Sequence, residues 1–474
     1  GTVSVTKSGT GNDNSTGNNI FNGVTTITNI SDSQIMLGNG NPDQFNASTT
    51  FNNNGSYRFY FAQSHNGFTT TFTDLTLNTN KSGGTDQWSF FAAEGTNTGF
   101  TVSGNLTINC AGTLQSNHRF LNGAGSTATY GGTVTVNNTN TNTATDITLG
   151  SNGTSTYNGN ILLSNSAGAG EIYFNANASA SSTQAATRSI SIGGGGFTGG
   201  RIALRRFAQA GATQTLALTG TSRIDIGPNS SFVGNLTVTS PRIFLDGVSV
   251  TGNAYFEKTG TTNDNSTGGN TISGTTTIVN SGDSEFNLAD TNPDTYQGLV
   301  TINNTGTSRV QIGINSAGNL FNGGLTINHN GNASGSVNTI IARSGASTAT
   351  INGTVTLTSN NANSNSGIII ANDGTVTING NIIVNSTNGR GVYFGNASGV
   401  VTQSAGFGVS SGTFNSGGLS FSRFTQSGTQ PSTLTLTGSS ILTVGTNSEF
   451  GGNVSFTAPQ VLLNGCTYQG TASI

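Results

Sequence analysis

The feature that most constrains the fold of this chain is a seven-residue pattern that recurs along its length. In residues 232–238, a large apolar residue is followed by glycine two positions later and by apolar residues four and six positions later. Alternate side chains of a strand point the same way, so Phe232 and Leu236 are expected to face a core while Thr237 faces solvent. Gly234, which has no Cβ, lets the backbone pass close to a neighbour. The pattern predicts a half-buried strand beside a tight corner.

The same pattern begins at many other positions, and the mean spacing of its starts is about 28 residues, within the range typical of stacked repeats. The further starts are Phe21, Phe45, Val102, Tyr130, Tyr157, Val250, Ile272, Tyr296, Phe321, Ile351, Ile378, Phe450 and Tyr468, with Phe72, Phe197 and Phe414 differing by one residue in spacing. We therefore predict an all-β fold, a β-solenoid of about 17 turns and most simply a right-handed parallel β-helix. The alternative is a string of β-sandwich domains, in which these rings would lie in separate modules.

A second, longer repeat is superimposed on the short one. The strings at 12–17 and 41–43 return at 263–268 and 292–294, an offset of 251 residues in both cases. We expect a first long repeat at 1–251, a second at 252–469 that is one turn shorter, and the start of a third at 470–474. The turn that begins at Phe72 is the one without a counterpart.

The composition limits the classes of function. Charged residues make up 7% of the chain, the net charge is −3, and no basic stripe of the kind that binds nucleic acid is present. A chain with so few apolar residues could be disordered. The 26 Phe and 9 Tyr, however, recur at regular positions within the repeat, which indicates a folded chain. No apolar run is long enough to span a bilayer. Abundant Gly, Thr and Asn indicate an extracellular or cell-surface protein.

Candidate chemical sites are few. Asp13 and Asp264 occupy equivalent positions in the two long repeats, and with neighbouring oxygen donors they are weak candidates for Ca²⁺ ligands, although such residues usually hydrogen-bond their own turn. Glu171 and Asp225 have no acidic counterpart in the second repeat. The histidines (His65, His118, His329) and the cysteines (Cys110, Cys466) are scattered. We expect no enzyme activity, no cofactor, and neither a disulfide framework nor a zinc site.

Three other features carry structural predictions. The segment 85–91 contains Trp88, and we expect it to pack as a satellite cluster over its turn, with an exposed contact loop as the alternative. Thr133 and Thr135 belong to Thr-x-Thr strings of the kind found in ice-binding arrays, but Asn and Ser interrupt that pattern. Asparagines that recur just beyond the heptad are expected to form ladders that satisfy corner backbone groups, and plain turn preference is a compatible alternative. These are Asn29, Asn109, Asn137, Asn165, Asn280, Asn303, Asn328 and Asn385.

The tandem long repeats, with their Phe/Tyr-x-Gly-x-apolar-Thr-apolar turns rich in Asn and Thr, resemble the giant repetitive cell-surface proteins of Bacteroidota. That group includes gliding-motility adhesins and the grappling-hook filaments of marine predatory bacteria. The resemblance implies type IX secretion, a structural filament of bundled identical chains, and attachment to a target cell or surface. It brings no catalytic residues. A carbohydrate-binding or polysaccharide-cleaving β-helix is the alternative function.

Overall fold

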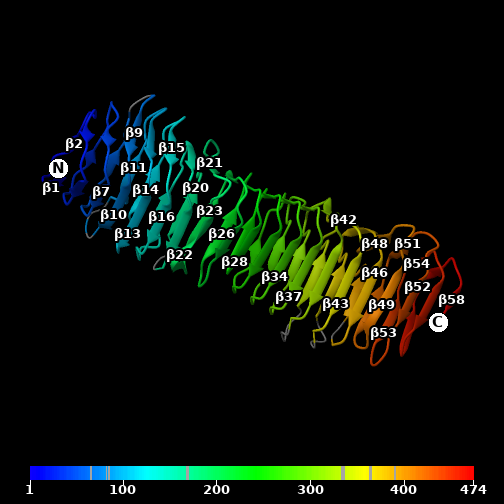
Figure 1. The fold of residues 1–474 in the computed structure, drawn as a ribbon. Helices are drawn as coiled ribbons and strands as arrows, with labels where there is room; N and C mark the ends of the chain where they lie inside the picture. Colours follow the sequence, from blue (N-terminus) through cyan, green and yellow to red (C-terminus); the bar gives the residue numbers. More distant parts are fainter. Residues whose placement is uncertain are drawn as a thin grey trace. The chain divides into compact units, whose positions relative to one another are not determined.

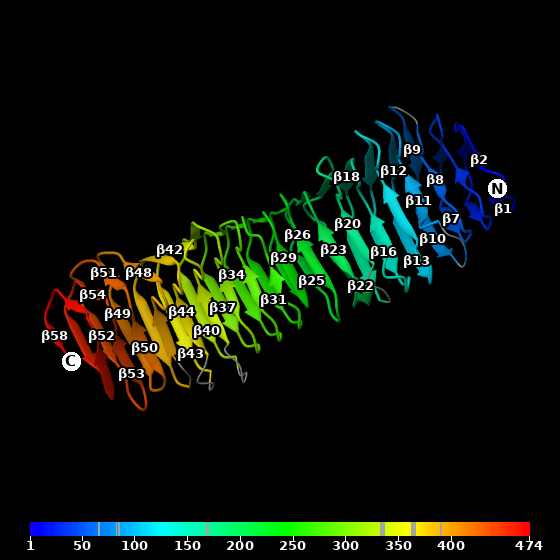
Figure 2. The ribbon, with the colours of Figure 1, turned by 180° about the vertical axis from the view of Figure 1, so that it is seen from behind.

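The computed structural model describes the chain except residues 65–66, 82, 84–85, 167–169, 332–336, 362–365 and 389–390. The described residues form 58 β-strands and no α-helix. They divide into two compact units, Gly1–Ser240 and Pro241–Ile474. Within each unit, successive turns of the chain stack through parallel strands (Figure 1 and Figure 2). The predicted fold class, a β-solenoid of about 17 turns, is confirmed.

Each turn of the first unit contains three strands, and each strand pairs with the strand three positions later along the chain. β1 (Val3–Lys7) pairs with β4 (Thr25–Asn29), β2 (Asp13–Asn14) with β5 (Ile35–Met36), and β3 (Ile20–Phe21) with β6 (Gln44–Phe45). All three pairings are parallel, because the chain crosses a whole turn before it pairs again. Repetition of these pairings builds three sheets, which are called sheets A, B and C in that order.

The remaining strands of the first unit extend the three sheets. Sheet A continues with β7 (Thr49–Asn53), β10 (Leu75–Lys81), β13 (Leu106–Gly112), β16 (Val134–Asn138), β19 (Ile161–Asn165), β22 (Ile190–Phe197), β25 (Gln214–Ala217) and β28 (Leu236–Ser240). Sheet B continues with β8 (Phe59–Phe61), β11 (Trp88–Ala92), β14 (Asn117–Phe120), β17 (Asp146–Thr148), β20 (Glu171–Phe174), β23 (Arg201–Leu204) and β26 (Arg223–Ile226). Sheet C continues with β9 (Thr69–Phe72), β12 (Gly99–Val102), β15 (Thr127–Tyr130), β18 (Thr154–Tyr157), β21 (Ser181–Gln184), β24 (Phe207–Gln209) and β27 (Ser231–Phe232).

The second unit begins with β29 (Arg242–Leu245) and repeats the three-sheet order. Its sheet A contains β31 (Ala254–Lys258), β34 (Thr276–Asn280), β37 (Val300–Asn304), β40 (Leu325–His329), β43 (Val355–Ser359), β46 (Ile382–Ser386), β49 (Val409–Phe414), β52 (Ser432–Thr435), β55 (Val454–Thr457) and β58 (Ala472–Ser473). Its sheet B contains β32 (Asp264–Asn265), β35 (Phe286–Leu288), β38 (Val310–Ile312), β41 (Asn338–Ile341), β44 (Gly367–Ile370), β47 (Gly391–Phe394), β50 (Gly418–Phe421), β53 (Ile441–Val444) and β56 (Gln460–Leu463). Its sheet C contains β30 (Ser249–Val250), β33 (Thr271–Ile272), β36 (Thr295–Tyr296), β39 (Asn319–Phe321), β42 (Thr348–Asn352), β45 (Thr375–Asn379), β48 (Val400–Gln403), β51 (Phe424–Gln426), β54 (Glu449–Phe450) and β57 (Thr467–Tyr468).

The residues that begin the heptads form one in-register column along sheet C of each unit. In the first unit the column is Phe21, Phe45, Phe72, Val102, Tyr130, Tyr157, Gln184, Gln209 and Phe232. In the second it is Val250, Ile272, Tyr296, Phe321, Ile351, Ile378, Gln403, Gln426, Phe450 and Tyr468. Neighbouring rings stack, with centroids 4.6 Å apart for Phe21 and Phe45 and 4.9 Å apart for Tyr130 and Tyr157. The heptad therefore marks one corner of each coil.

Two of the expected starts lie elsewhere. Phe197 and Phe414 end β22 and β49 of sheet A, opposite Asn165 and Ser386, and each of these pairings contains a register shift. The bulge places a large apolar residue where an unbulged strand of sheet A carries a smaller polar one. Neither Phe197 nor Phe414 therefore begins a turn.

Four buried glutamines occupy the column positions that the pattern missed. Gln184 and Gln403 follow Tyr157 and Ile378, and the next turns carry Gln209 and Gln426. The side-chain amide of Gln184 donates to the carbonyl of Ser189 at 3.0 Å, and that of Gln403 donates to the carbonyl of Gly408 at 3.1 Å. These amides satisfy corner carbonyls, as buried polar groups require.

The heptad at 232–238 shows why the pattern has its form. Leu236 and Val238 are buried, and Thr237 between them is half-buried. Gly234 lies so close to the preceding turn that a Cβ there would be 2.3 Å from the carbonyl oxygen of Ala212 and 2.4 Å from that of Gly211. Any larger residue would push the two turns apart at this corner.

Candidate functional site

Sheet A of the first unit carries a column of hydrogen-bonded, half-buried amides. The side chain of Asn109 donates to Asn78 and accepts from Asn137, both at 2.9 Å. The column continues through Asn52 below and Ser164 above. In the second unit, Asn328 donates to Asn303 at 2.9 Å, and Asn385 to Thr358 at 3.5 Å. The predicted ladder is confirmed for these outward asparagines.

The other predicted asparagines point into the coil. Asn29, Asn165 and Asn280 are buried, and each donates to the carbonyl of a residue four or five positions later, at 2.9–3.1 Å. They satisfy backbone carbonyl groups at corners, as expected, through hydrogen bonds within their own turn. Beside the amide ladder, the register aligns the threonines Thr26, Thr50, Thr76, Thr107 and Thr135. On β16 the outward pair is Thr135 and Asn137, so a Thr-x-Thr array is not formed there.

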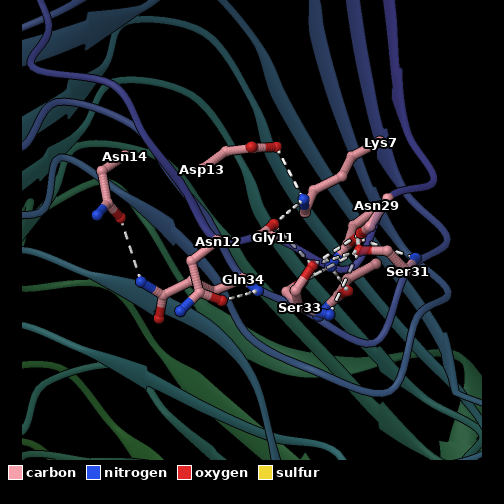
Figure 3. A network of polar contacts seen from close by, with 11 residues as sticks. Lys7, Gly11, Asn12, Asp13, Asn14, Asn29, Ser31, Ser33 and Gln34 are labelled. Carbon is pink, nitrogen blue, oxygen red and sulfur yellow. Dashed lines mark hydrogen bonds and ion pairs between the residues drawn. The ribbon is translucent and has the colours of Figure 1, made fainter.

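The weak Ca²⁺ candidate Asp13 pairs with a lysine of the same turn (Figure 3). The Lys7 ammonium lies 3.0 Å from the Asp13 carboxylate and also donates to the carbonyl of Gly11. Ser33 donates to the same carbonyl at 3.0 Å, which links the network to the next turn. The positive charge beside this carboxylate is therefore supplied by the chain itself.

Asp264, its counterpart in the second unit, is buried and similarly paired. It accepts from the backbone NH of Ile243 at 2.8 Å and from Arg242 at 3.4 Å. Burial raises the pKa of Asp264 to about 6. Over the part of the chain that the structure describes, no group of three or more His, Cys, Asp or Glu side chains is arranged to hold a metal ion. The donor set at Asp13 and Asp264 fits a structural ion pair rather than a calcium ligand shell.

Acidic residues that are distant in the sequence come together on the outer face of sheet B in the first unit. Arg201 contacts the carboxylates of Glu171 and Asp225, the latter at 3.1 Å, and its guanidinium lies 5.0 Å from the centre of the Tyr173 ring. Arg223 is paired with the same Asp225. We call these residues the Arg201 cluster. Sequence reasoning treated Glu171 and Asp225 as isolated, because the register that joins them spans two turns of unequal length.

Asp146 lies beside the Arg201 cluster, opposite Glu171 in the register. Burial, and then the neighbouring Glu171 carboxylate, raise the pKa of Asp146 to about 6. The corresponding positions in the second unit carry Gly391, Gly418 and Thr443. Among the residues that the structure describes, the cluster therefore occurs in the first unit only.

A second cluster on the same face, four turns earlier, combines aromatic rings with arginines. Tyr60 and Phe91 stack with centroids 4.7 Å apart. The Arg119 guanidinium lies 4.9 Å from the ring centres of both Phe91 and Trp88, and that of Arg58 lies 5.6 Å from Phe91. We call these five residues the Trp88 cluster. The prediction that Trp88 packs as a satellite cluster is confirmed, while Thr85 of the predicted segment lies outside the described residues.

The Trp88 cluster borders an open cavity of about 350 Å³ that is lined by Tyr57, Arg58, Asp86, Gln87 and Trp88. Beneath it, the ammonium of buried Lys81 donates to the carbonyl oxygens of Asp86, at 3.1 Å, and of Trp88. Burial lowers the pKa of Lys81 to about 8. This lysine braces the segment that carries Asp86 and Trp88 from the inside.

The histidines and cysteines that the structure describes do not form a site with these clusters. His118 and His329 are buried, and burial lowers their pKa values to about 3 and about 4, so both are neutral near pH 7. His118 stacks on Phe90 inside the coil, and His65 lies outside the described residues. Cys110 and Cys466 are free thiols, and burial raises the pKa of Cys110 to about 12.

Comparison of the chain with family models, with curated proteins and with solved structures gave no match. Within the described ranges, no helix has the length and apolar character needed to cross a bilayer. The functional argument therefore rests on the fold and on the surfaces described above.

Proposed function

We propose that this chain is a structural segment of an extracellular, cell-surface filament that serves in attachment to surfaces or to target cells. The observation that carries the proposal is the unbroken parallel pairing within each unit, with one buried column along sheet C. Such stacking gives each turn contacts only with its neighbours, so length is gained by adding turns. A stalk requires this property, whereas a compact enzyme does not.

The surface of sheet A supports side-by-side assembly of identical chains. Its outward threonines and asparagines are uncharged, and the amides already form ladders within one chain. Two such faces meet without the cost of bringing like charges together. We propose that copies of the chain bundle through sheet A and that the chain is exported by type IX secretion. In this proposal the chain carries out no catalytic step.

The proposal is tested on cells that produce the chain. An antibody raised against the purified second unit should label surface filaments in electron micrographs, and deletion of the coding region should remove both the filaments and most attachment. A deletion of an unrelated surface protein is the control. Label confined to the cell interior, or normal attachment after the deletion, would contradict the proposal.

A further inference from the structure

The cavity beside Trp88 has the composition of a ligand site rather than of a packing defect. Two half-buried rings, Tyr57 and Trp88, border it together with the guanidinium of Arg58, the carboxylate of Asp86 and the exposed amide of Gln87. Its volume of about 350 Å³ lies at the lower end of the range of small-molecule sites. Rings supply apolar contact area, and the planar polar groups supply directional hydrogen bonds.

Three of the residues that line the cavity, Arg58, Asp86 and Trp88, are held in place before any ligand binds. One oxygen of Asp86 accepts from the backbone NH of Trp88 at 3.1 Å, and the other accepts from Arg58 at 2.6 Å. Arg58 also donates to the Tyr60 hydroxyl at 3.2 Å. The indole of Trp88 packs on Phe91, with ring centres 5.2 Å apart. Little side-chain freedom is left to lose on binding, which favours affinity.

Each arginine beside the cavity is already paired with a carboxylate, and the buried Lys81 ammonium is held by backbone carbonyl oxygens. Arg58 is paired with Asp86 at 2.6 Å, and Arg119, behind the indole, is paired with Glu94 at 2.8 Å. An anionic ligand such as a phosphate, sulfate or uronate would compete with a carboxylate already in place for each arginine. The pairing of both arginines with carboxylates therefore favours a neutral ligand that offers hydroxyl groups and an apolar face.

We propose that this cavity binds a neutral saccharide unit of a polysaccharide. One C–H face of the sugar ring stacks on the Trp88 indole, and the Tyr57 ring supplies further apolar contact at the cavity wall. The sugar hydroxyls exchange hydrogen bonds with Gln87, Arg58 and Asp86. No bond is made or broken, so the site is a binding site and not a catalytic one.

This site is independent of the filament proposal, because it depends on one turn rather than on the stacking of many. Sequence alignment of the two long repeats leaves the turn at Phe72 without a counterpart, and Trp88 follows that turn. We therefore expect one saccharide site in the first unit and none of this kind in the second.

The only tryptophan of the chain is the proposed stacking residue, so its emission reports directly on the site. The full chain would be titrated with soluble β-1,3-glucan, α-mannan and β-1,4-galactan, with alginate as the acidic comparison. We expect a saturable change in emission with at least one neutral polymer, and retarded migration in native gels that contain this polymer.

Variants then locate the binding. Trp88→Ala should weaken binding about thirty-fold, as truncation of a central aromatic contact does, and Trp88→Phe should weaken it less. Tyr255→Ala, which removes a half-buried ring from sheet A of the second unit, is the matched control and should bind like the parent. Circular dichroism of each variant establishes that the strands persist.

Three results would overturn the proposal. The first is that none of the three neutral polymers changes the emission of Trp88 or the migration of the chain. The second is that binding survives in Trp88→Ala at the parent affinity. The third is that only alginate binds, because that would show a charge-driven surface elsewhere. Filament labelling and attachment are measured separately from saccharide binding. The saccharide proposal can therefore fail while the filament proposal stands, and the reverse is also true.

Discussion

The two units share one backbone plan but differ in what fills and covers it. In the first unit, the inner positions of sheet B carry Phe59 and Phe90, and its outer face carries the Trp88 and Arg201 clusters. In the second unit, the strand equivalent to β8 carries Val310 inside, and Gly391 occurs where the first unit has Glu171. Both satisfy the same parallel register.

This difference indicates that the solenoid fold tolerates many different side chains on its outer face. Parallel pairing and one inward column are kept in both units, even where that column changes from stacked rings to aliphatic residues. The outer face of sheet B is then free to vary, and a site is added to one unit without disturbing the plan. Positions at which the two units carry different outer side chains are therefore the best candidates for functional sites in such a chain.

The largest expected effect comes from the aromatic interior of the first unit. Phe90→Ala removes a ring whose centre lies 5.4 Å from that of Phe59 and 5.5 Å from that of His118, and should cost about 4 kcal/mol of local stability. Ile368→Ala, which also removes an inward side chain from sheet B but in the second unit, should cost about 3 kcal/mol. Hydrogen exchange followed by mass spectrometry should show faster exchange only in the unit that carries each change. Equal acceleration in both units would contradict nearest-neighbour stacking.

The Arg201 cluster gives the next largest effect. Arg201→Met leaves Glu171 and Asp225 close together without one of their arginines, and should cost about 2 kcal/mol. The urea midpoint measures this loss. Ser420→Ala, on the corresponding face of the second unit, should change stability by less than about 0.5 kcal/mol. If Arg201→Met changed stability as little as Ser420→Ala, the Arg201 cluster would be a set of solvated surface charges that does not stabilise the fold.

The amide ladder predicts a smaller difference between the units. Asn109→Ala breaks one hydrogen bond to Asn78 and one from Asn137, and should cost about 1.5 kcal/mol. Asn328→Ala breaks the bond to Asn303, and should cost about half as much. Thermal unfolding of the two variants gives the comparison. An equal cost at both positions would show that the ladder does not act as a continuous network.

The smallest expected effect is a pH dependence in the second unit. Asp294 is buried, and burial raises its pKa to about 6, although it accepts hydrogen bonds from Asn270 and Tyr296. The folded state therefore binds a proton more readily than the unfolded state, and stability rises as the pH falls from 7 to 5, by about 1 kcal/mol. Asp294→Asn should abolish this part of the gain in urea unfolding at the two pH values. A parent that loses stability over this range, or a variant with an unchanged gain, would contradict the assignment.

The sequence predicted the solenoid because a buried strand face with period two leaves a repeated pattern of large residues. The pattern missed the turns at Gln184 and Gln403, because glutamine is usually a surface residue. Its burial here depends on a hydrogen bond to a corner carbonyl, which the sequence does not reveal. The pattern also misplaced Phe197 and Phe414, because a bulged strand of sheet A imitates the spacing of a turn start. Local pattern thus fixes the type of element but not every register.

The candidate sites were harder to predict, and for a single physical reason. Glu171, Arg201 and Asp225 meet only through parallel pairing of strands from three successive turns, and the turns differ in length. Trp88 was recognised as a packing residue, but Arg119, which packs on it, comes from the turn after it, and Arg58, which packs on nearby Phe91, comes from the turn before it. Contacts of this kind require the register of sheet B, whose short strands carry no heptad.

The most direct test of the filament account is the axial spacing of filaments isolated from cells that produce the chain and labelled by antibody to it. The account predicts a strong axial spacing of about 4.8 Å in electron diffraction or cryo-electron microscopy, from turns stacked along the filament axis. Labelled filaments without that axial spacing would contradict the central claim that stacked turns of this chain build the filament.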